Sequence, residues 1–168
     1  MRLNLTSLEN FRDQLARVDA LPQLALVGVV SGLITGAFIC LFRLALDLPL
    51  STMLPGGNAE NFEGLSSSQH FYFPLIGALI LAGLFALLPL AARYTGIVHV
   101  LERLDKHQGH LPVSNLLVQF FGGLIALGSG QSCGREGPAI HLGSASSSLL
   151  GQWLKLPNNS IRLLVGCG

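Results

Sequence analysis

Charged residues are scarce in this chain, and their scarcity indicates its broad class. Asp, Glu, Lys and Arg make up 11% of the 168 residues, hydrophobic residues make up 50%, and the mean hydropathy is +0.56. Soluble domains carry about 25% charged residues, so this composition favours a membrane protein. The formal net charge of +1 provides no basic surface, which argues against nucleic acid as a partner.

Cysteine and clustered metal ligands are scarce as well. Cys40, Cys133 and Cys167 lie in apolar or glycine-rich surroundings without metal or redox spacing, so we predict small buried residues and no disulfide framework. His107 and His110 are three residues apart in a polar turn, with no third ligand nearby. We therefore predict no metal site and no cofactor.

The first twenty residues differ from the rest of the chain. Residues 1–20 mix regularly spaced apolar side chains with charges of both signs, and no apolar core of a signal peptide follows Arg2. This spacing suits an amphipathic helix on the membrane surface or a solvated tail, and the sequence does not separate the two. We predict a cytoplasmic segment over 1–20 and a transmembrane domain over 21–168.

Two apolar runs are long enough to cross a hydrocarbon core of about 30 Å. The first is predicted over Leu21–Leu46 and the second over Phe71–Leu90, with Pro74 in its first turn and a loop over Pro49–His70 between them. Arg43 and Asp47 are four residues apart and are predicted to pair or to reach toward the membrane interface. The first span also carries a G-x-x-x-G face that suits close helix packing. This face consists of Gly28, Gly32 and Gly36.

The flanking charges predict how these spans are oriented. Lys and Arg occur before the first span and after the second, whereas the intervening loop has only Glu60 and Glu63. Positively charged flanks favour the cytoplasmic side, so the N-terminus and residues 93–106 are predicted to be cytoplasmic.

A short segment after the second span has two interpretations. Val98–Leu104 is too short to cross a membrane. It is either a cytoplasmic connecting helix or a broken helix whose N-terminus points into the protein, as in transporter binding sites.

An adjacent cation and anion interrupt the apolar second half of the chain. Arg135 and Glu136 lie in a glycine-rich run between an apolar segment over Val113–Leu127 and a small-residue segment over Ala139–Leu150. Ionisable residues at membrane depth are costly and indicate function. Pro138 suits the first turn of a helix, and the free amides and dipole of a helix N-terminus attract anions. We therefore predict an anion pathway with Glu136 at its mouth.

The small-residue segment and the end of the sequence carry further expectations. The serine-rich stretch 144–148 is too polar for lipid and is predicted to be enclosed by other helices, with His141 as a hydrogen-bonded packing residue. A last helix is predicted from Ile161, with Asn158, Asn159 or Ser160 as its N-cap. A sequence that stops inside a fresh apolar segment at Gly168 is expected to be incomplete.

The run Gly134-Arg135-Glu136-Gly137-Pro138 resembles the G-R-E-G-P signature of the CLC chloride channels and chloride/proton antiporters. The approach Phe120-Phe121-Gly122-Gly123-Leu124 and Gly128-Ser129-Gly130 is similar to that of the family, and a weaker similarity extends over 21–168. An earlier family motif, G-S-G-I-P, aligns with Tyr94-Thr95-Gly96-Ile97-Val98. Tyr94 stands where the family has glycine, and Val98 where it has proline.

The resemblance implies an all-α, multi-pass membrane protein with broken or re-entrant helices, here an incomplete first half of a CLC-type inverted repeat. It implies that Glu136 is a gating carboxylate that occupies an anion position and swings out when protonated or displaced. It further implies chloride as the transported ligand, protons as a second candidate partner, the lipid bilayer as surroundings and homodimeric intact relatives. The anion-binding residues that it implies are Thr95, Gly96, Ile97, Gly134, Arg135, Glu136, Gly137 and Pro138.

These 168 residues are expected to form a truncated member of that family, because its later motifs do not occur in them. The sequence does not distinguish a channel from an antiporter, and it does not identify the preferred anion. One alternative is a non-transporting membrane module that uses the Gly28–Gly36 face for assembly. A distant alternative is a serine hydrolase, since Gly130-Gln131-Ser132-Cys133-Gly134 fits G-x-S-x-G; that reading needs a strand before Ser132.

Overall fold

The computed structural model describes residues 21–59 and 61–168, and this part of the chain is helical throughout, without strands. The predicted all-α class is confirmed, whereas the prediction for residues 1–20 lies outside the described residues. Six α-helices occur among the described residues: α2 (Leu21–Met53), α3 (Ser67–Leu87), α4 (Gly96–Lys106), α5 (Val113–Gly128), α6 (Glu136–Trp153) and α7 (Asn158–Cys167). Short 3₁₀ turns join them: η1 (Pro55–Gly57), η2 (Phe62–Gly64) and η3 (Leu90–Ala92).

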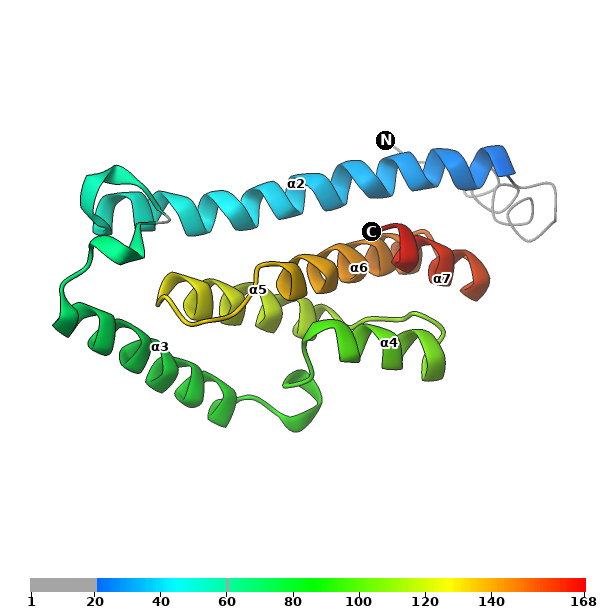
Figure 1. Ribbon diagram of the computed structural model, residues 1–168. Coiled ribbons are helices and arrows are strands. Elements are labelled where there is room, and N and C mark those ends of the chain that lie inside the picture. The colour runs from blue at the N-terminus through cyan, green and yellow to red at the C-terminus, as the bar shows by residue number, and fades with distance from the viewer. Residues whose placement is uncertain (1–20, 60) are drawn as a thin grey trace, which may run out of the picture.

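Helix α6 is the centre of the packing. It contacts α2, α4, α5 and α7, while α5 also packs against α2 and α3. Figure 1 shows α2 along one edge, α3 splayed away from it, and α5 and α6 between them. The glycine-rich loop joins α5 to α6, with Ser129 buried and most of its other residues exposed.

Helices α2 and α3 have the length and composition of membrane spans. Leu24–Met53 has a mean hydropathy of 2.4 and Ser67–Leu87 of 1.9, and most of each window is not buried by the rest of the chain. Leu33 is 71% exposed and Leu79 is 65% exposed. Apolar helices that a protein leaves uncovered suit a lipid environment, which separates them from the core helices of a soluble protein.

Helix α2 extends beyond its predicted end at Leu46 and reaches Met53. Pro49 lies inside the helix, so the predicted loop from Pro49 to His70 is wrong in its first part. The reason is burial: Leu46, Leu50 and Leu54 continue the packed face and join the hydrophobic core. That burial outweighs the hydrogen bond lost at proline. The predicted pair of Arg43 Nε and Asp47 Oδ2 forms at 3.3 Å.

Helix α3 begins four residues earlier than predicted and ends three residues earlier. Ser66 and Gln69 form a capping box at its start, a pattern that is visible in the sequence and was missed. Pro74 consequently lies inside the helix and not in its first turn. The end follows from Pro89, because the residue before a proline disfavours helical geometry.

The serine-rich face of α6 is enclosed, as predicted. All residues from His141 to Ser148 are buried. Ser147 accepts a hydrogen bond from Ser31 at 2.7 Å, and Thr35 lies 3.0 Å from Ser146 and 3.2 Å from Ser147. Hydroxyl pairs of this kind join helices where lipid provides no hydrophobic drive for association.

Two smaller predictions are wrong, and the glycine face of α2 has no partner among the described residues. The three cysteines are exposed, because Cys40 lies on the uncovered side of α2, Cys133 lies in the loop before α6, and Cys167 is the last residue of α7. Helix α7 starts at Asn158, three residues before the predicted start, and Pro157 is its N-cap. Proline has no backbone N–H to donate, so it suits a position at the edge of a helix. The packed face of α2 uses Ser31 and Thr35. Within residues 21–59 and 61–168, no atom lies within 4 Å of a Cβ built on Gly28, Gly32 or Gly36.

Candidate functional site

Two helices begin at a common cavity. Helix α4 starts at Gly96 after Thr95, and α6 starts at Glu136 after Arg135. A cavity of about 230 Å³ is lined by Thr95 from the first start and by Gly134 and Pro138 from the second. Helices α3 and α5 contribute the apolar walls, including Leu81, Phe85 and Val118. Residues that are about forty positions apart in the sequence therefore meet at one cavity.

The cavity brings together only part of the predicted set. Thr95, Gly134 and Pro138 line it, whereas Gly96, Ile97, Arg135, Glu136 and Gly137 are not among its lining residues. Ile97 is 43% exposed, and the side chain of Glu136 is also exposed. The predicted Pro138 position is confirmed, because it is the third residue of α6 and lies in its first turn.

Backbone donors are available at both helix starts, although Gln119 Oε1 already accepts from the first amide of α4. Neither Thr95 nor Arg135 caps its helix through a side-chain hydrogen bond. Free first-turn amides and the helix dipole favour negative charge. The start of α4 thus has the geometry of a broken helix that faces the interior, which favours this alternative over a cytoplasmic connecting helix.

Two amide side chains of α5 hold the backbone before α4, and the sequence reasoning missed them. Asn115 Nδ2 donates to the carbonyl oxygens of Ala91 at 3.0 Å and Tyr94 at 2.8 Å. Gln119 Oε1 accepts from the backbone N–H of Gly96 at 2.9 Å. Irregular backbone at membrane depth needs such partners. The signal was present, since Asn115 and Gln119 are one turn apart in an otherwise apolar helix.

Gly96 is required at its position for a conformational reason. Its φ is +80°, in the left-handed region that glycine adopts without steric cost. Because its N–H already bonds Gln119, Gly96 contributes a turn that aims α4 at the cavity. The amide of Gly96 is therefore not a free donor for an anion in this conformation.

The loop before α6 is anchored on α3. A Cβ placed on Gly77 would collide with the side chain of Ser129, so the loop can approach α3 only where glycine stands. Gly123 plays a similar role in α5, where an added Cβ would lie 3.2 Å from Phe42 Cζ and 3.5 Å from Pro138 Cβ. These close approaches place the α6 start against α5 and α2.

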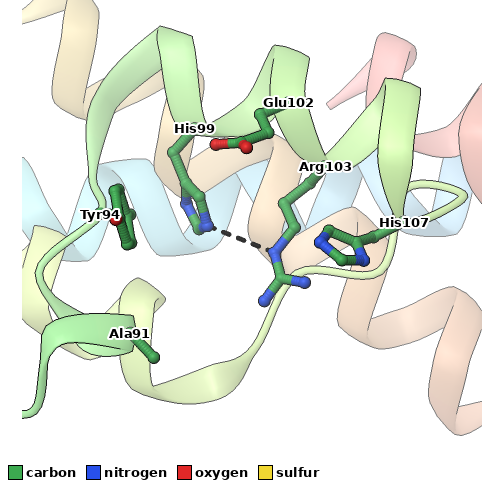
Figure 2. Close-up of a pocket in the computed structure, with 6 residues that line it drawn as sticks. All are labelled: Ala91, Tyr94, His99, Glu102, Arg103 and His107. Carbon is green, nitrogen blue, oxygen red and sulfur yellow. Dashed lines mark hydrogen bonds between the residues drawn. The ribbon is translucent and has the colours of Figure 1, made fainter.

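A second, polar pocket adjoins α4. It has a volume of about 250 Å³ and is lined by Ala91, Tyr94, His99, Glu102, Arg103 and His107 (Figure 2). Glu102 is already paired with Lys106, with Oε1 and Nζ 3.0 Å apart. No three histidine, cysteine or acidic side chains of the described ranges cluster closely enough to hold a metal ion.

The serine hydrolase alternative lacks its structural requirement. A nucleophile elbow needs a β-strand that runs into the serine. Here helix α5 ends at Gly128, and a short irregular stretch leads to Ser132. The G-x-S-x-G match over 130–134 is therefore part of a helix–loop–helix connection.

Comparisons with known proteins agree with this geometry. The family model described as voltage gated chloride channel matches residues 76–168. The H(+)/Cl(-) exchange transporter ClcA of Vibrio cholerae is 43% identical over 47 residues, which cover 28% of this chain and 10% of that protein. The chloride channel protein CLC-c of Arabidopsis thaliana is 33% identical over 109 residues, which cover 56% of this chain and 14% of that protein.

The chain thus spans 10% to 14% of the length of these curated relatives. No solved structure matches it. The family match covers more than half of the sequence and includes α4, α5, the loop and α6, together with all the residues that line the cavity. The chain belongs to the voltage-gated chloride channel family and is a membrane protein.

Proposed function

We propose that this chain serves anion transport by holding chloride at the cavity between the starts of α4 and α6. The observation that carries the proposal is the meeting of Thr95 with Gly134 and Pro138 around one cavity. The Thr95 hydroxyl can donate a hydrogen bond to chloride. The uncapped first turn of α6 adds backbone donors and a favourable dipole. Membership of a family whose relatives are named as chloride channels and exchangers supports the choice of anion.

Glu136 is the proposed gate. It is the first residue of α6, so its carboxylate is at the positive end of the helix dipole, where an anion is also favoured. Carboxylate and chloride repel each other, and only one of them occupies the position at a time. Protonation or displacement of Glu136 then opens the position to chloride, which links anion movement to pH.

Chloride titration of the purified chain in detergent tests this assignment. Glu136→Gln removes the competing charge, so we expect chloride affinity at neutral pH to rise roughly tenfold and its pH dependence to disappear. Thr95→Val should weaken binding because it removes the hydroxyl donor. Glu63→Gln is the matched control, since Glu63 is an exposed carboxylate in η2, away from the cavity residues. Identical affinity and pH response in the Glu136 and Glu63 variants would refute the gate.

A second candidate function is a non-transporting assembly module. The observation that favours it is the uncovered glycine face of α2, where Gly28, Gly32 and Gly36 have no neighbour within 4 Å of an added Cβ. Chloride efflux from liposomes that contain the chain separates the two functions. Efflux that responds to Thr95→Val supports transport. Efflux at the level of empty liposomes, combined with loss of self-association in Gly32→Leu, supports assembly.

A further inference from the structure

Two buried histidines join the helices that begin at the cavity. His99 of α4 is 6% exposed, and His141 of α6 is fully buried. The Nδ1 atom of His99 lies 3.0 Å from the Nε2 atom of His141. The proposed chloride position does not involve these residues, so their contact requires a separate account.

The neighbouring arginine determines which nitrogens carry protons. Arg103 Nε donates to His99 Nε2 at 3.3 Å, so that nitrogen is an acceptor and carries no proton. The proton of neutral His99 is then on Nδ1, which donates to His141 Nε2. His141 in turn carries its proton on Nδ1, the buried atom that has no hydrogen-bond partner within the described residues. Both imidazoles are therefore neutral Nδ1–H tautomers, each selected by a specific contact.

The contact lies just behind the two helix starts. His99 is three residues after Gly96, and His141 is five residues after Glu136. At a rise of about 1.5 Å per residue, His99 is just under one helical turn and His141 about one and a half turns from the helix start. Gln119 holds the start of α4 to α5, but the histidine bond is the polar side-chain link between α4 and α6 themselves.

Few charged groups surround this link. The pocket beside His99 contains Glu102, Arg103 and His107 of α4 and its cap, and Glu102 is paired with Lys106. The ring of Tyr94, which precedes α4, stacks on the His99 ring. Helix α5 has no titratable residue, and α6 has only Glu136 besides His141. Figure 2 shows the Arg103 side chain between His99 and His107 at the pocket.

We propose that His99 and His141 are positioning residues that set α4 against α6, and thereby the separation of Thr95 from the start of α6. This role rests on the proposed function for its effect on chloride, but the geometry itself is independent of chloride. An added proton must occupy His99 Nε2 or His141 Nε2, both of which accept hydrogen bonds in the neutral pair. Acid therefore breaks one contact of the chain from Arg103 to His141.

The unmodified chain provides the first test. In ¹⁵N NMR of histidine-labelled protein, two of the five imidazoles should be Nδ1–H tautomers at neutral pH, and single substitutions assign them to positions 99 and 141. Water favours the other tautomer for an exposed neutral histidine, so simple burial does not predict this result. Finding Nε2–H on either residue would overturn the proposal.

Matched substitutions provide the second test. The amide nitrogen of asparagine reaches the place of Nδ1, and a glutamine side-chain terminus reaches the place of Nε2. His99→Asn therefore keeps the donor to His141, whereas His99→Gln keeps only the contact with Arg103. Likewise, His141→Gln keeps an acceptor for the Nδ1–H of His99, and His141→Asn does not. His107→Gln is the control, because His107 lines the same pocket outside the link.

Two readouts separate positioning from chloride binding. Spin labels at Leu101 of α4 and Ile140 of α6, which are exposed residues, report the distance between the helices in a cysteine-free background. We expect the parent distance in His99→Asn, His141→Gln and His107→Gln, and a broadened distribution in His99→Gln and His141→Asn. Chloride affinity should fall roughly threefold or more in His99→Gln and His141→Asn, and stay at the parent value in the other three variants.

The outcomes distinguish the two proposals. If the distances follow this pattern while no variant and no parent sample binds chloride, the positioning role holds and the proposed function fails. If all five variants keep the parent distance, the positioning role fails whatever chloride does.

Discussion

The two amide side chains of α5 show how single polar residues make an irregular backbone tolerable inside an apolar assembly. Asn115 satisfies two carbonyl groups before α4, and Gln119 satisfies the first amide of α4. Neither residue belongs to the motifs that indicated an anion pathway. Their role becomes visible only when the segment 91–96 is placed against α5. The sequence alone does not show which backbone group an Asn or Gln side chain will bind.

Replacing Gln119 with Leu should release the start of α4. The N–H of Gly96 would lose its acceptor in a half-buried place, which costs about 1 kcal/mol of unfolding free energy or more. We expect a lower melting temperature and faster hydrogen exchange at the Gly96 amide, measured by NMR.

The control for this change is Leu117→Ala, which alters an exposed residue of the same helix. It should leave the exchange at Gly96 unaltered. Equal exchange at Gly96 in the parent and in the Gln119 variant would show that the 2.9 Å contact does not protect this amide.

At the scale of elements, burial set the end of α2 and capping set the start of α3. Predictions based on proline positions placed both boundaries wrongly. The sequence predicts Pro49 in a loop and Pro74 in the first turn of a helix, yet both lie inside helices. In α2, Leu46 and Leu50 continue the packed stripe past the arginine–aspartate pair, so the helix continues with them. The capping box at Ser66 could have been identified from the sequence.

The loop between α5 and α6 depends on its approach to α3. Gly77→Ala should displace the loop, because the added methyl group collides with Ser129, and we expect a loss of roughly 1 to 3 kcal/mol of stability. Thermal unfolding and the thiol reactivity of Cys133, which lies in this loop, measure the effect.

Gly83→Ala is the matched control in the same helix, since no atom lies within 4 Å of its added Cβ. It should be neutral or stabilising by up to about 1 kcal/mol through helix propensity. Ser129→Gly should restore the loop in the Gly77→Ala background. A Gly77→Ala protein with parent stability and parent thiol reactivity would contradict the close approach.

At the scale of the molecule, the orientation in the membrane remains a prediction from charge. Lys and Arg follow α3 and occur before α2, and the intervening loop has acidic residues only. In proteoliposomes of known orientation, a cysteine at Asp105 should react with an impermeant maleimide on the cytoplasmic side, and one at Glu63 on the opposite side.

Both positions are exposed, so accessibility within the protein does not limit the reaction. The background carries no native cysteine, because Cys40, Cys133 and Cys167 are exposed and would also react. Labelling of both positions from the same side would refute the orientation.

Composition and motif together determined the class of this protein. Few charges, two long apolar runs and the G-R-E-G-P signature were sufficient to predict a helical membrane protein of the chloride channel family, because lipid restricts which chains can cross it. The enclosure of the serine-rich helix also followed from its polarity alone.

Only the tertiary structure decided which residues meet. It placed Thr95 beside Gly134 and Pro138, engaged the Gly96 amide with Gln119, and joined His99 to His141. The physical reason is that these contacts link helices far apart in the chain, and helical periodicity specifies a face of each helix without naming the helix that covers it. Packing selects that partner, and with it the geometry of the cavity.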